Sequence, residues 1–316
     1  MPGFIGRRLA YLVPVLIAVT VLTFLIAALL PGDLAIAMLA DEATPEKVAA
    51  LHREMGLDQP LVFQYLHWLG GALAGDLGRS VRTGEPVLLA ILQRLPVTLE
   101  LMLLAQLIAL ALGVPLGILC AVRAGGAFDR LVTASAFGKL AVPAYMLAIV
   151  LIYVFSVRLK LLPATGYVPL NEDIAGNLRS FVLPAVTLGF GEWPVLMRVL
   201  RSDMIATLQE DYIAMATAKG LKPWRILLVH ALKPSSLTLV TVTGINIGRL
   251  IGGAVLVETI FALPGIGRLL ISAINARDFV MVQGVVLFVA TGFVLINFAV
   301  DMLYGVLDPR IRLGRT

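Results

Sequence analysis

Six long runs of apolar residues dominate the hydropathy pattern of this chain, and shorter polar segments separate them. The runs cover residues 9–30, 97–121, 131–157, 181–200, 237–259 and 280–303. A run of roughly 17–25 apolar residues is long enough to cross a bilayer as a helix. The pattern therefore predicts an all-α membrane protein with six transmembrane helices.

The first run has an alternative interpretation, because Arg7 and Arg8 precede it as basic residues precede the apolar part of a signal peptide. Signal peptides hold only about 7–15 apolar residues, whereas a membrane span needs roughly 20. Residues 9–30 are therefore interpreted as a retained first transmembrane helix.

The distribution of lysine and arginine predicts which side each loop faces, since cytoplasmic loops carry the excess. With a cytoplasmic N-terminus, thirteen fall inside: Arg7, Arg8, Arg123, Arg130, Arg198, Arg201, Lys219, Lys222, Arg225, Lys233, Arg310, Arg312 and Arg315. Five fall in the two short outer loops: Arg158, Lys160, Arg179, Arg268 and Arg277. The long segment 31–95 is not counted, because long loops cross the membrane largely regardless of charge. Both termini are predicted to be cytoplasmic.

Composition supports the membrane class. Of the 316 residues, 59% are hydrophobic and 14% are charged, whereas soluble domains hold about 45–50% apolar and about 25% charged residues. The net charge of +5 accompanies no basic stripe with interleaved aromatic residues. Contact with membrane lipid is therefore expected, and nucleic-acid binding is not. The single cysteine, Cys120, excludes an intrachain disulfide.

The chain is predicted to form a single transmembrane domain over 1–316, with two polar inserts. The first, 31–95, is expected outside the cytoplasm between the first and second spans. It holds two helical patterns: one has Thr44 as N-cap, Pro45 at the first helical position and Gly56 just past the end, and the other begins at Pro60. The second insert, 201–235, is a cytoplasmic loop between the fourth and fifth spans.

Catalytic constellations are missing from the sequence. No phosphate-binding G-x-x-x-x-G-K-[ST] motif occurs, because Gly138-Lys139 is followed by Leu140. The three histidines, His52, His67 and His230, lie in the predicted loops and cannot serve a serine within the bilayer. No cluster has the spacing of a zinc site. We therefore expect no catalytic residues, no metal site and no enzymatic activity in this chain.

The loop sequence DYIAMATAKGLKPWRILLVHALKPS, 211–235, combines alanines, one glycine and four basic residues. Asp211 is typical of a helix start, and Gly220 of a helix stop in the left-handed conformation. Pro223 is well placed to begin a second helix over 224–232. This small-residue helical turn could dock into a groove of another protein. It could also be an ordinary basic loop held near anionic lipid headgroups.

The loop resembles the coupling loop of ABC-transporter permeases, written E-A-A-x3-G-x9-I-x-L-P. Gly220 matches the motif glycine and Ala216 its third residue, while Ala214 and Met215 replace the first two. Leu232 also matches, whereas His230 and Lys233 differ and Pro234 comes one place late. Further segments resemble the dipeptide/oligopeptide permease family in order: LPGD, GLDQPL, GDLGRS, LPATGY, ETIFALPGIGRLL, VQGVVL and YGVLDPRIR.

This resemblance implies a permease subunit, in a bacterial or archaeal cytoplasmic membrane, that forms half of the translocation pathway of an ATP-driven importer. The implied partners are a second homologous permease, two cytoplasmic ATPase subunits that bind ATP and Mg, and an extracytoplasmic substrate-binding protein. The residues implied to contact an ATPase are Asp211, Tyr212, Ala214, Ala216, Ala218, Lys219, Gly220 and Leu221. Family members carry dipeptides, oligopeptides, nickel chelates and similar molecules, so the substrate stays open.

Three ionisable residues, Lys139, Glu192 and Arg249, lie well inside predicted spans. Such residues usually face a bundle interior or a watery cavity. Glu192 could pair with Lys139 or Arg249 to stabilise the bundle, or the three could contact a second permease. They could also line the translocation path and meet a charged substrate. An ion-coupled secondary transporter is the alternative function, although no internal repeat supports it.

Overall fold

The computed structural model describes residues 2–29, 44–54, 56 and 58–307, and within these ranges the regular structure is helical. The helices are α1 (Pro2–Leu29), α3 (Pro45–Glu54), α4 (Leu61–Leu73), α5 (Val87–Val122), α6 (Ala127–Leu140), α7 (Ala144–Leu151), α8 (Ile174–Leu208), α9 (Asp211–Ala218), α10 (Pro223–Arg225), α11 (Leu232–Ile260), α12 (Ile266–Asn275) and α13 (Phe279–Leu307). Two π-helical segments, η2 (Ile152–Arg158) and η3 (Ile226–Ala231), follow α7 and α10.

The predicted all-helical membrane architecture is confirmed at a coarse level. Four helices in the described residues are long and apolar enough to cross a membrane, and a fifth span is obtained if α6 and α7 are counted together. For the first predicted span, the described apolar stretch is Ala10–Ile26 within α1. The count of six and the placement of both termini in the cytoplasm remain predictions.

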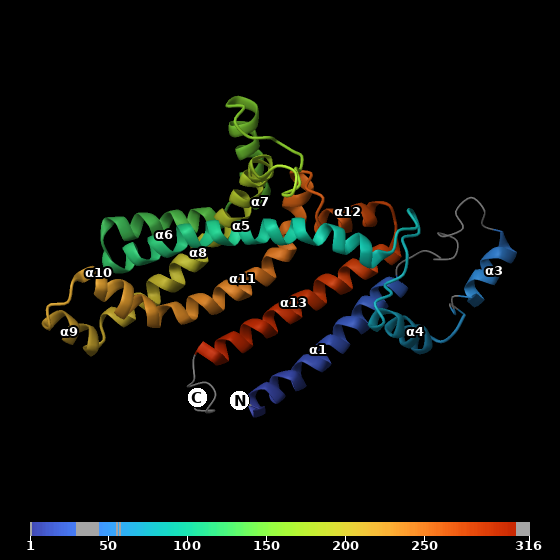
Figure 1. Ribbon diagram of the computed structural model, residues 1–316, viewed down its shortest axis with the longest axis horizontal. Helices are drawn as coiled ribbons and strands as arrows, with labels where there is room; N and C mark the ends of the chain where they lie inside the picture. Colours follow the sequence, from blue (N-terminus) through green and yellow to red (C-terminus); the bar gives the residue numbers. More distant parts are fainter. Residues whose placement is uncertain (1, 30–43, 55, 57, 308–316) are drawn as a thin grey trace.

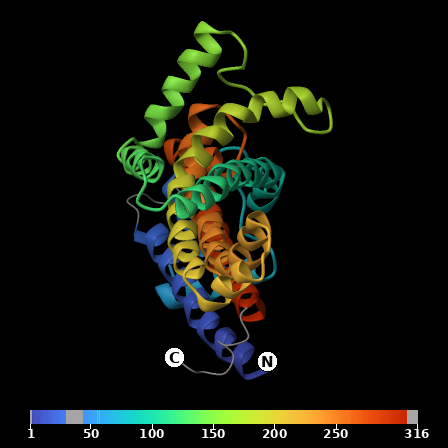
Figure 2. The ribbon, with the colours of Figure 1, turned by 90° about the vertical axis from the view of Figure 1, so that its left-hand side faces the viewer.

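The third predicted span, 131–157, is broken in the structure. α6 and α7 meet at a bend of 98°, and Pro143 lies immediately before α7. Proline has no N–H to donate and disfavours helical geometry in the residue before it, so it ends α6 and lets the chain change direction. As a result α7 projects to one side of the bundle (Figures 1 and 2).

α5 and α8 run alongside each other and pack together (Figure 1). Their backbones approach closely because glycines lie in the seam: a Cβ on Gly189 would collide with the carbonyl oxygen of Ala105, and one on Gly117 would lie 3.1 Å from the carbonyl oxygen of Met197. Small residues permit this close contact between membrane helices. Leu101, Phe181 and Leu250, from α5, α8 and α11, meet in one buried cluster.

The helices α3 and α4 lie within the predicted insert 31–95, and α5 already begins at Val87. The predicted capping of α3 is confirmed, since the Lys47 amide donates to Thr44 Oγ1 at 3.4 Å and Gly56 has a φ of +65°. α4 packs against α1, because the hydroxyls of Tyr65 and Thr20 are 2.8 Å apart and the Tyr65 ring lies edge-on to Phe24. Residues 30–43 lie outside the described part.

The two ends of the bundle carry different short helices. α9 and α10 lie at one end of its long axis, and α12 lies toward the other end near the start of α5 (Figure 1). We refer to these as the α9 end and the α12 end.

Candidate coupling site

α9 is an eight-residue helix with two different faces. Ile213 is 5% exposed and packs with residues of α5, α8 and η3 in a buried cluster, while Ala216 is half-buried against the same cluster. The remaining α9 residues of the predicted site are exposed: Asp211, Tyr212, Ala214 and Ala218. One side therefore seats α9 on the bundle, and the other is open to a partner.

Gly220 ends α9 in a sharp turn, as the sequence predicted. Its φ is +72°, in the left-handed region that glycine tolerates best. The Gly220 amide donates to the Thr217 carbonyl at 2.9 Å, and the Leu221 amide donates to the Ala216 carbonyl at 3.2 Å. These two bonds form a Schellman motif, which satisfies carbonyls that the end of a helix leaves free. The turn also leaves Lys219 exposed and Leu221 half-buried.

An apolar pocket of about 490 Å³, open to the surface, lies between α9 and the ends of α5, α8 and α10. Its lining includes Ile213, Leu208 and Ile226. On this side α9 therefore borders open space rather than a continuous packed core.

The predicted second helix, 224–232, is not a separate helix in the structure but the first part of a longer one. It begins at Pro223, as predicted, but continues through η3 into α11. In η3 the Leu232 amide donates to the Leu227 carbonyl, five residues earlier. Pro234 has no N–H for the carbonyl of His230, four residues before it. The Tyr212 hydroxyl donates to this carbonyl at 3.3 Å. This hydrogen bond links α9 to η3, the segment that leads into α11.

A buried ion pair near the α9 end was not predicted from the sequence. Arg201 of α8 donates from Nε and from its terminal nitrogen to the two carboxylate oxygens of Asp129, each at 2.6 Å. Asp129 is 3% exposed and also accepts from the Gly125 amide at 2.8 Å. The pair joins α6 to the helix that leads into α9. The signal that could have indicated it is opposite charge at the same end of neighbouring spans.

The three intramembrane charges are near one another but not in direct contact. Glu192 interacts electrostatically with Arg249 and, more weakly, with Lys139. Among the described side chains neither cation lies within 4.0 Å of the carboxylate, and Lys139 Nζ donates to the Val142 carbonyl at 3.4 Å. Glu192 is half-buried and Arg249 is exposed. The internal-pair and path-lining interpretations both remain hypotheses.

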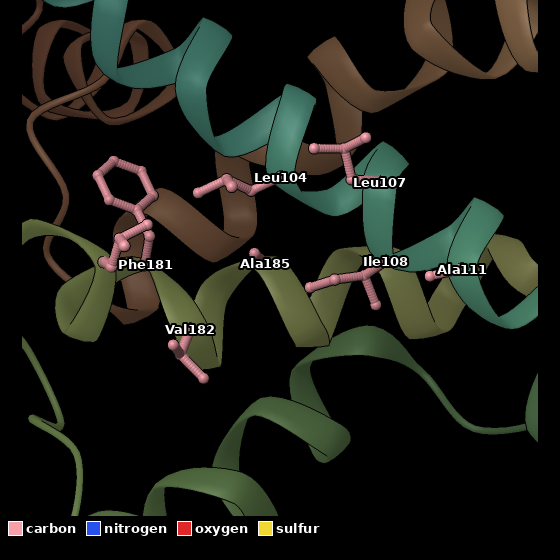
Figure 3. Close-up of a pocket in the computed structure, with 8 residues that line it drawn as sticks. Leu104, Leu107, Ile108, Ala111, Phe181, Val182 and Ala185 are labelled. Atoms are coloured by element: carbon pink, nitrogen blue, oxygen red, sulfur yellow. The ribbon is translucent and has the colours of Figure 1, made fainter.

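A separate pocket between α5 and α8 has no charged lining. Figure 3 shows Leu104, Leu107 and Ile108 of α5 lying opposite Phe181, Val182 and Ala185 of α8. Its volume is about 290 Å³, and its lining residues are all apolar. Such a surface offers no group that could bind the charged termini of a peptide. Of the two features, only the three charges have the chemistry to do so.

Comparisons with known proteins support the family. The model described as binding-protein-dependent transport system inner membrane component matches residues 113–313, and the model for the N-terminal part of such components matches residues 1–102. A peptide transport system permease protein of Brucella abortus (strain 2308) is 44% identical over 312 residues, covering 99% of each chain. The dipeptide transport system permease protein DppB of Escherichia coli (strain K12) is 40% identical over 336 residues, also covering 99% of each.

A solved structure has the same fold. The inward-facing MetNI methionine ABC transporter matches with a TM-score of 0.56 at 17% identity, covering 69% of this chain and 96% of that chain. Family models and relatives together cover almost the whole sequence. The chain belongs to the family of binding-protein-dependent transport system inner membrane components, which are permeases of ABC transporters.

Proposed function

We propose that this chain is the permease subunit of an ATP-driven peptide importer and that α9 is its coupling helix. The observation that carries the proposal is the two-faced geometry of α9: Ile213 anchors one side, and the other side stays exposed up to the turn at Gly220. An ATPase groove that holds the exposed side could move α9 as a unit. The exposed contact set is Asp211, Tyr212, Ala214, Ala218, Lys219 and Gly220, and the half-buried Ala216 and Leu221 lie at its edge.

In this proposal the chain supplies a path and its partners supply the energy. Two cytoplasmic ATPase subunits bind ATP and Mg and press on α9 and on its counterpart in a second, homologous permease. The exposed apolar side chains of α7 and η2, such as Ile149 and Val157, offer a surface for that second permease or for lipid. An extracytoplasmic binding protein delivers the substrate. The chain itself performs no catalysis.

The distribution of lysine and arginine supports an orientation of the bundle in which the α9 end faces the cytoplasm. The α9 end carries the exposed cations Lys219, Lys222 and Arg225 and is proposed to face the cytoplasm. The α12 end then faces outward, together with α3 and α4 of the insert 31–95. The loop 201–235 is the cytoplasmic coupling loop.

The names of the relatives support peptides as the substrate class, and DppB is named as a dipeptide permease. A zwitterionic peptide carries an ammonium and a carboxylate group. Glu192 can meet the first, while Arg249 and Lys139 can meet the second. Because these side chains are near each other without being paired, they remain available to a passing substrate.

Replacing Arg249 with leucine should reduce the uptake of peptides with a free carboxylate by about tenfold or more, because an intramembrane counter-charge is lost. Uptake of the same peptide as its C-terminal amide should fall less. The measurement is uptake of both labelled forms by cells expressing the variant. Equal uptake by variant and parent would contradict the path-lining role.

Replacing Tyr212 with phenylalanine should reduce substrate transported per ATP hydrolysed by about two- to fivefold, because one weak hydrogen bond contributes about 0.5–1 kcal/mol. The ring is kept, so its contact with an ATPase is unchanged. Pro234→Ala restores an N–H for His230, and in that background the Tyr212→Phe effect should shrink. An equal effect in both backgrounds would contradict the link between α9 and α11.

Purification of the tagged chain from its native membrane tests the proposed function. An ABC permease should bring down nucleotide-hydrolysing subunits in amounts similar to its own, and reconstituted uptake should require ATP. Uptake by the isolated chain, driven by an ion gradient, would instead identify a secondary transporter and overturn the proposal.

A further inference from the structure

A polar cluster lies at one end of the apolar pocket between α5 and α8 (Figure 3). Glu100 precedes Leu104 of the pocket by four residues on α5, and Asn177 precedes Phe181 by four residues on α8. Residues four apart lie on one face of a helix, one turn from each other. Asn177 Nδ2 donates to Glu100 Oε2 at 3.4 Å, so the two side chains meet between the helices. They add polar chemistry where the apolar lining ends.

Both side chains keep acceptor oxygens that the chain does not satisfy. Asn177 is fully buried, and its Nδ2 also donates to the Val168 carbonyl at 3.0 Å. Its Oδ1 accepts no hydrogen bond from the described residues, although buried acceptors normally have a partner. Glu100 is half-buried, and no described lysine or arginine nitrogen lies within 4.0 Å of its carboxylate. The pair is therefore open to a donor with positive charge.

Tyr167 borders the same pair. Its ring lies edge-on to Phe181 of the pocket, with the ring centroids 6.0 Å apart. Burial raises the pKa of the Tyr167 phenol, and the nearby carboxylates of Glu100 and Glu172 raise it further. The hydroxyl therefore stays protonated beside two negative charges. We call Glu100, Tyr167 and Asn177 the Glu100 cluster, and none of its three side chains carries a positive charge.

The face of α8 that lines the pocket continues to Glu192. Ala185 lines the pocket, and Glu192 follows it by seven residues, which is two turns along the same helix face. Fifteen residues separate Asn177 from Glu192, roughly 22 Å at the rise of an α-helix. A carboxylate thus lies beyond each end of the apolar lining.

We propose that the Glu100 cluster and the α5–α8 pocket form a peptide subsite, in which Glu100 and Asn177 Oδ1 accept from the N-terminal ammonium and the pocket holds an apolar first side chain. An ammonium group has three N–H donors, and a hydrogen bond to a carboxylate is strong where water is scarce. The pocket volume of about 290 Å³ is close to the lower end of the range for small-ligand pockets.

This inference rests on the proposed function, in which the α12 end faces outward. Two residues before Glu100, Thr98 Oγ1 accepts from the amide of Ile266, the first residue of α12, at 2.9 Å. The Glu100 cluster therefore lies toward the α12 end. An entering peptide would meet Glu100 first and Glu192 deeper in the bundle.

Phosphatidylethanolamine is the competing occupant, because it also joins an ammonium group to an apolar chain. Its phosphate lies two carbons from the ammonium and would approach the carboxylates of Glu100 and Glu172, where like charges repel. The ammonium of a peptide is instead followed by an uncharged amide. A peptide therefore fits the charges of the cluster better.

Photolabelling of the complete transporter tests the subsite. The probe is leucyl-alanine whose leucine carries a diazirine, applied in phosphatidylcholine nanodiscs, and mass spectrometry should find it on residues 104–111 or 178–185. The N-acetylated probe should label about tenfold less, because a hydrogen bond to a charged group is lost. Glu100→Gln should reduce labelling by the free probe about tenfold and leave labelling by the acetylated probe unchanged. Glu172→Gln, at an exposed carboxylate near Tyr167, is the matched control and should stay within about twofold.

A second variant tests the apolar part of the subsite. Val182 lines the pocket and is 39% exposed, so a larger side chain can enter the pocket without displacing the core. Val182→Phe should reduce labelling by the leucyl probe about tenfold, because one apolar pocket discriminates by about this factor. Uptake of glycyl-alanine, which has no first side chain to place there, should stay within about twofold of the parent.

Equal labelling of Glu100→Gln and the parent, or equal labelling by the free and acetylated probes, would overturn the subsite. Labelling that disappears when phosphatidylethanolamine is added to the nanodiscs would identify lipid as the occupant and also overturn it. No labelling of the pocket in a parent transporter that imports the peptide would overturn the subsite and leave the proposed function standing. A parent transporter without ATP-dependent uptake of any peptide would instead contradict the proposed function.

Discussion

Replacing Gly220 with tryptophan is expected to abolish most of the uptake, by at least about tenfold, while the chain still enters the membrane. Apart from its chain neighbours, no described residue has an atom within 4 Å of a Cβ at this position, so the first atom of the new side chain meets no obstacle. It projects from the turn at the end of α9 instead. A bulky group there would keep an ATPase groove from closing on the helix, and loss of one central contact typically costs 2 kcal/mol or more, about thirtyfold.

Two variants separate bulk from backbone strain. Gly220→Asn should retain most uptake, because asparagine tolerates the left-handed conformation. Gly125→Trp is the matched control, since Gly125 has a φ of +76°, has no neighbour within 4 Å and lies in the turn between α5 and α6. It should leave uptake within about twofold of the parent. Equal losses at Gly220 and Gly125 would contradict a specific role for the α9 turn.

Replacing Asp129 with asparagine should destabilise the protein by about 3 kcal/mol, because breaking a buried ion pair leaves the partner charge uncompensated. Arg201 would lose the carboxylate that it contacts with two nitrogens, each at 2.6 Å. The side chain of Arg201 is 29% exposed, so water recovers part of the loss. Thermal unfolding of the purified complex in detergent measures the effect.

Glu85→Gln provides the comparison for this variant. Glu85 and Arg94 lie 4.0 Å apart, and both side chains are 29% exposed. Both side chains are partly in water and the two charges only just reach contact distance, and such a pair contributes about 0–1 kcal/mol, so this variant should unfold close to the parent temperature. If both variants shifted the thermal unfolding transition alike, the Asp129–Arg201 pair would not hold α6 to α8 as the geometry indicates.

Local backbone chemistry made part of this structure predictable. Gly220 could be identified as a helix stop because a left-handed residue favours glycine whatever surrounds it. Thr44 and Gly56 delimit α3 for equally local reasons. Apolar runs located the interior of the long helices for the same kind of reason, since the length needed to cross a bilayer is fixed.

Features that depend on contacts between distant segments could not be predicted. Asp129 and Arg201 are 72 residues apart, and each alone looks like an ordinary charge near the membrane surface. α5 begins at Val87 rather than at residue 97, because buried contacts of Val87 and Ile91 with Met281 and Val285 extend the helix beyond the apolar run. The link from Tyr212 to His230 depends on the π-helical turn, whose position no propensity indicated.

Site-specific crosslinking from α9 tests the central claim most directly. Met215 is 57% exposed on the open side of α9, and the native Cys120 is fully buried, so Met215→Cys supplies the one accessible thiol among the described residues. A short bifunctional thiol reagent, applied to complexes whose ATPase carries a single cysteine at the rim of its permease-facing groove, should join the two chains, and ATP should change the yield. A crosslink that forms only with a protein outside the cytoplasm, or none with the ATPase, would contradict the account.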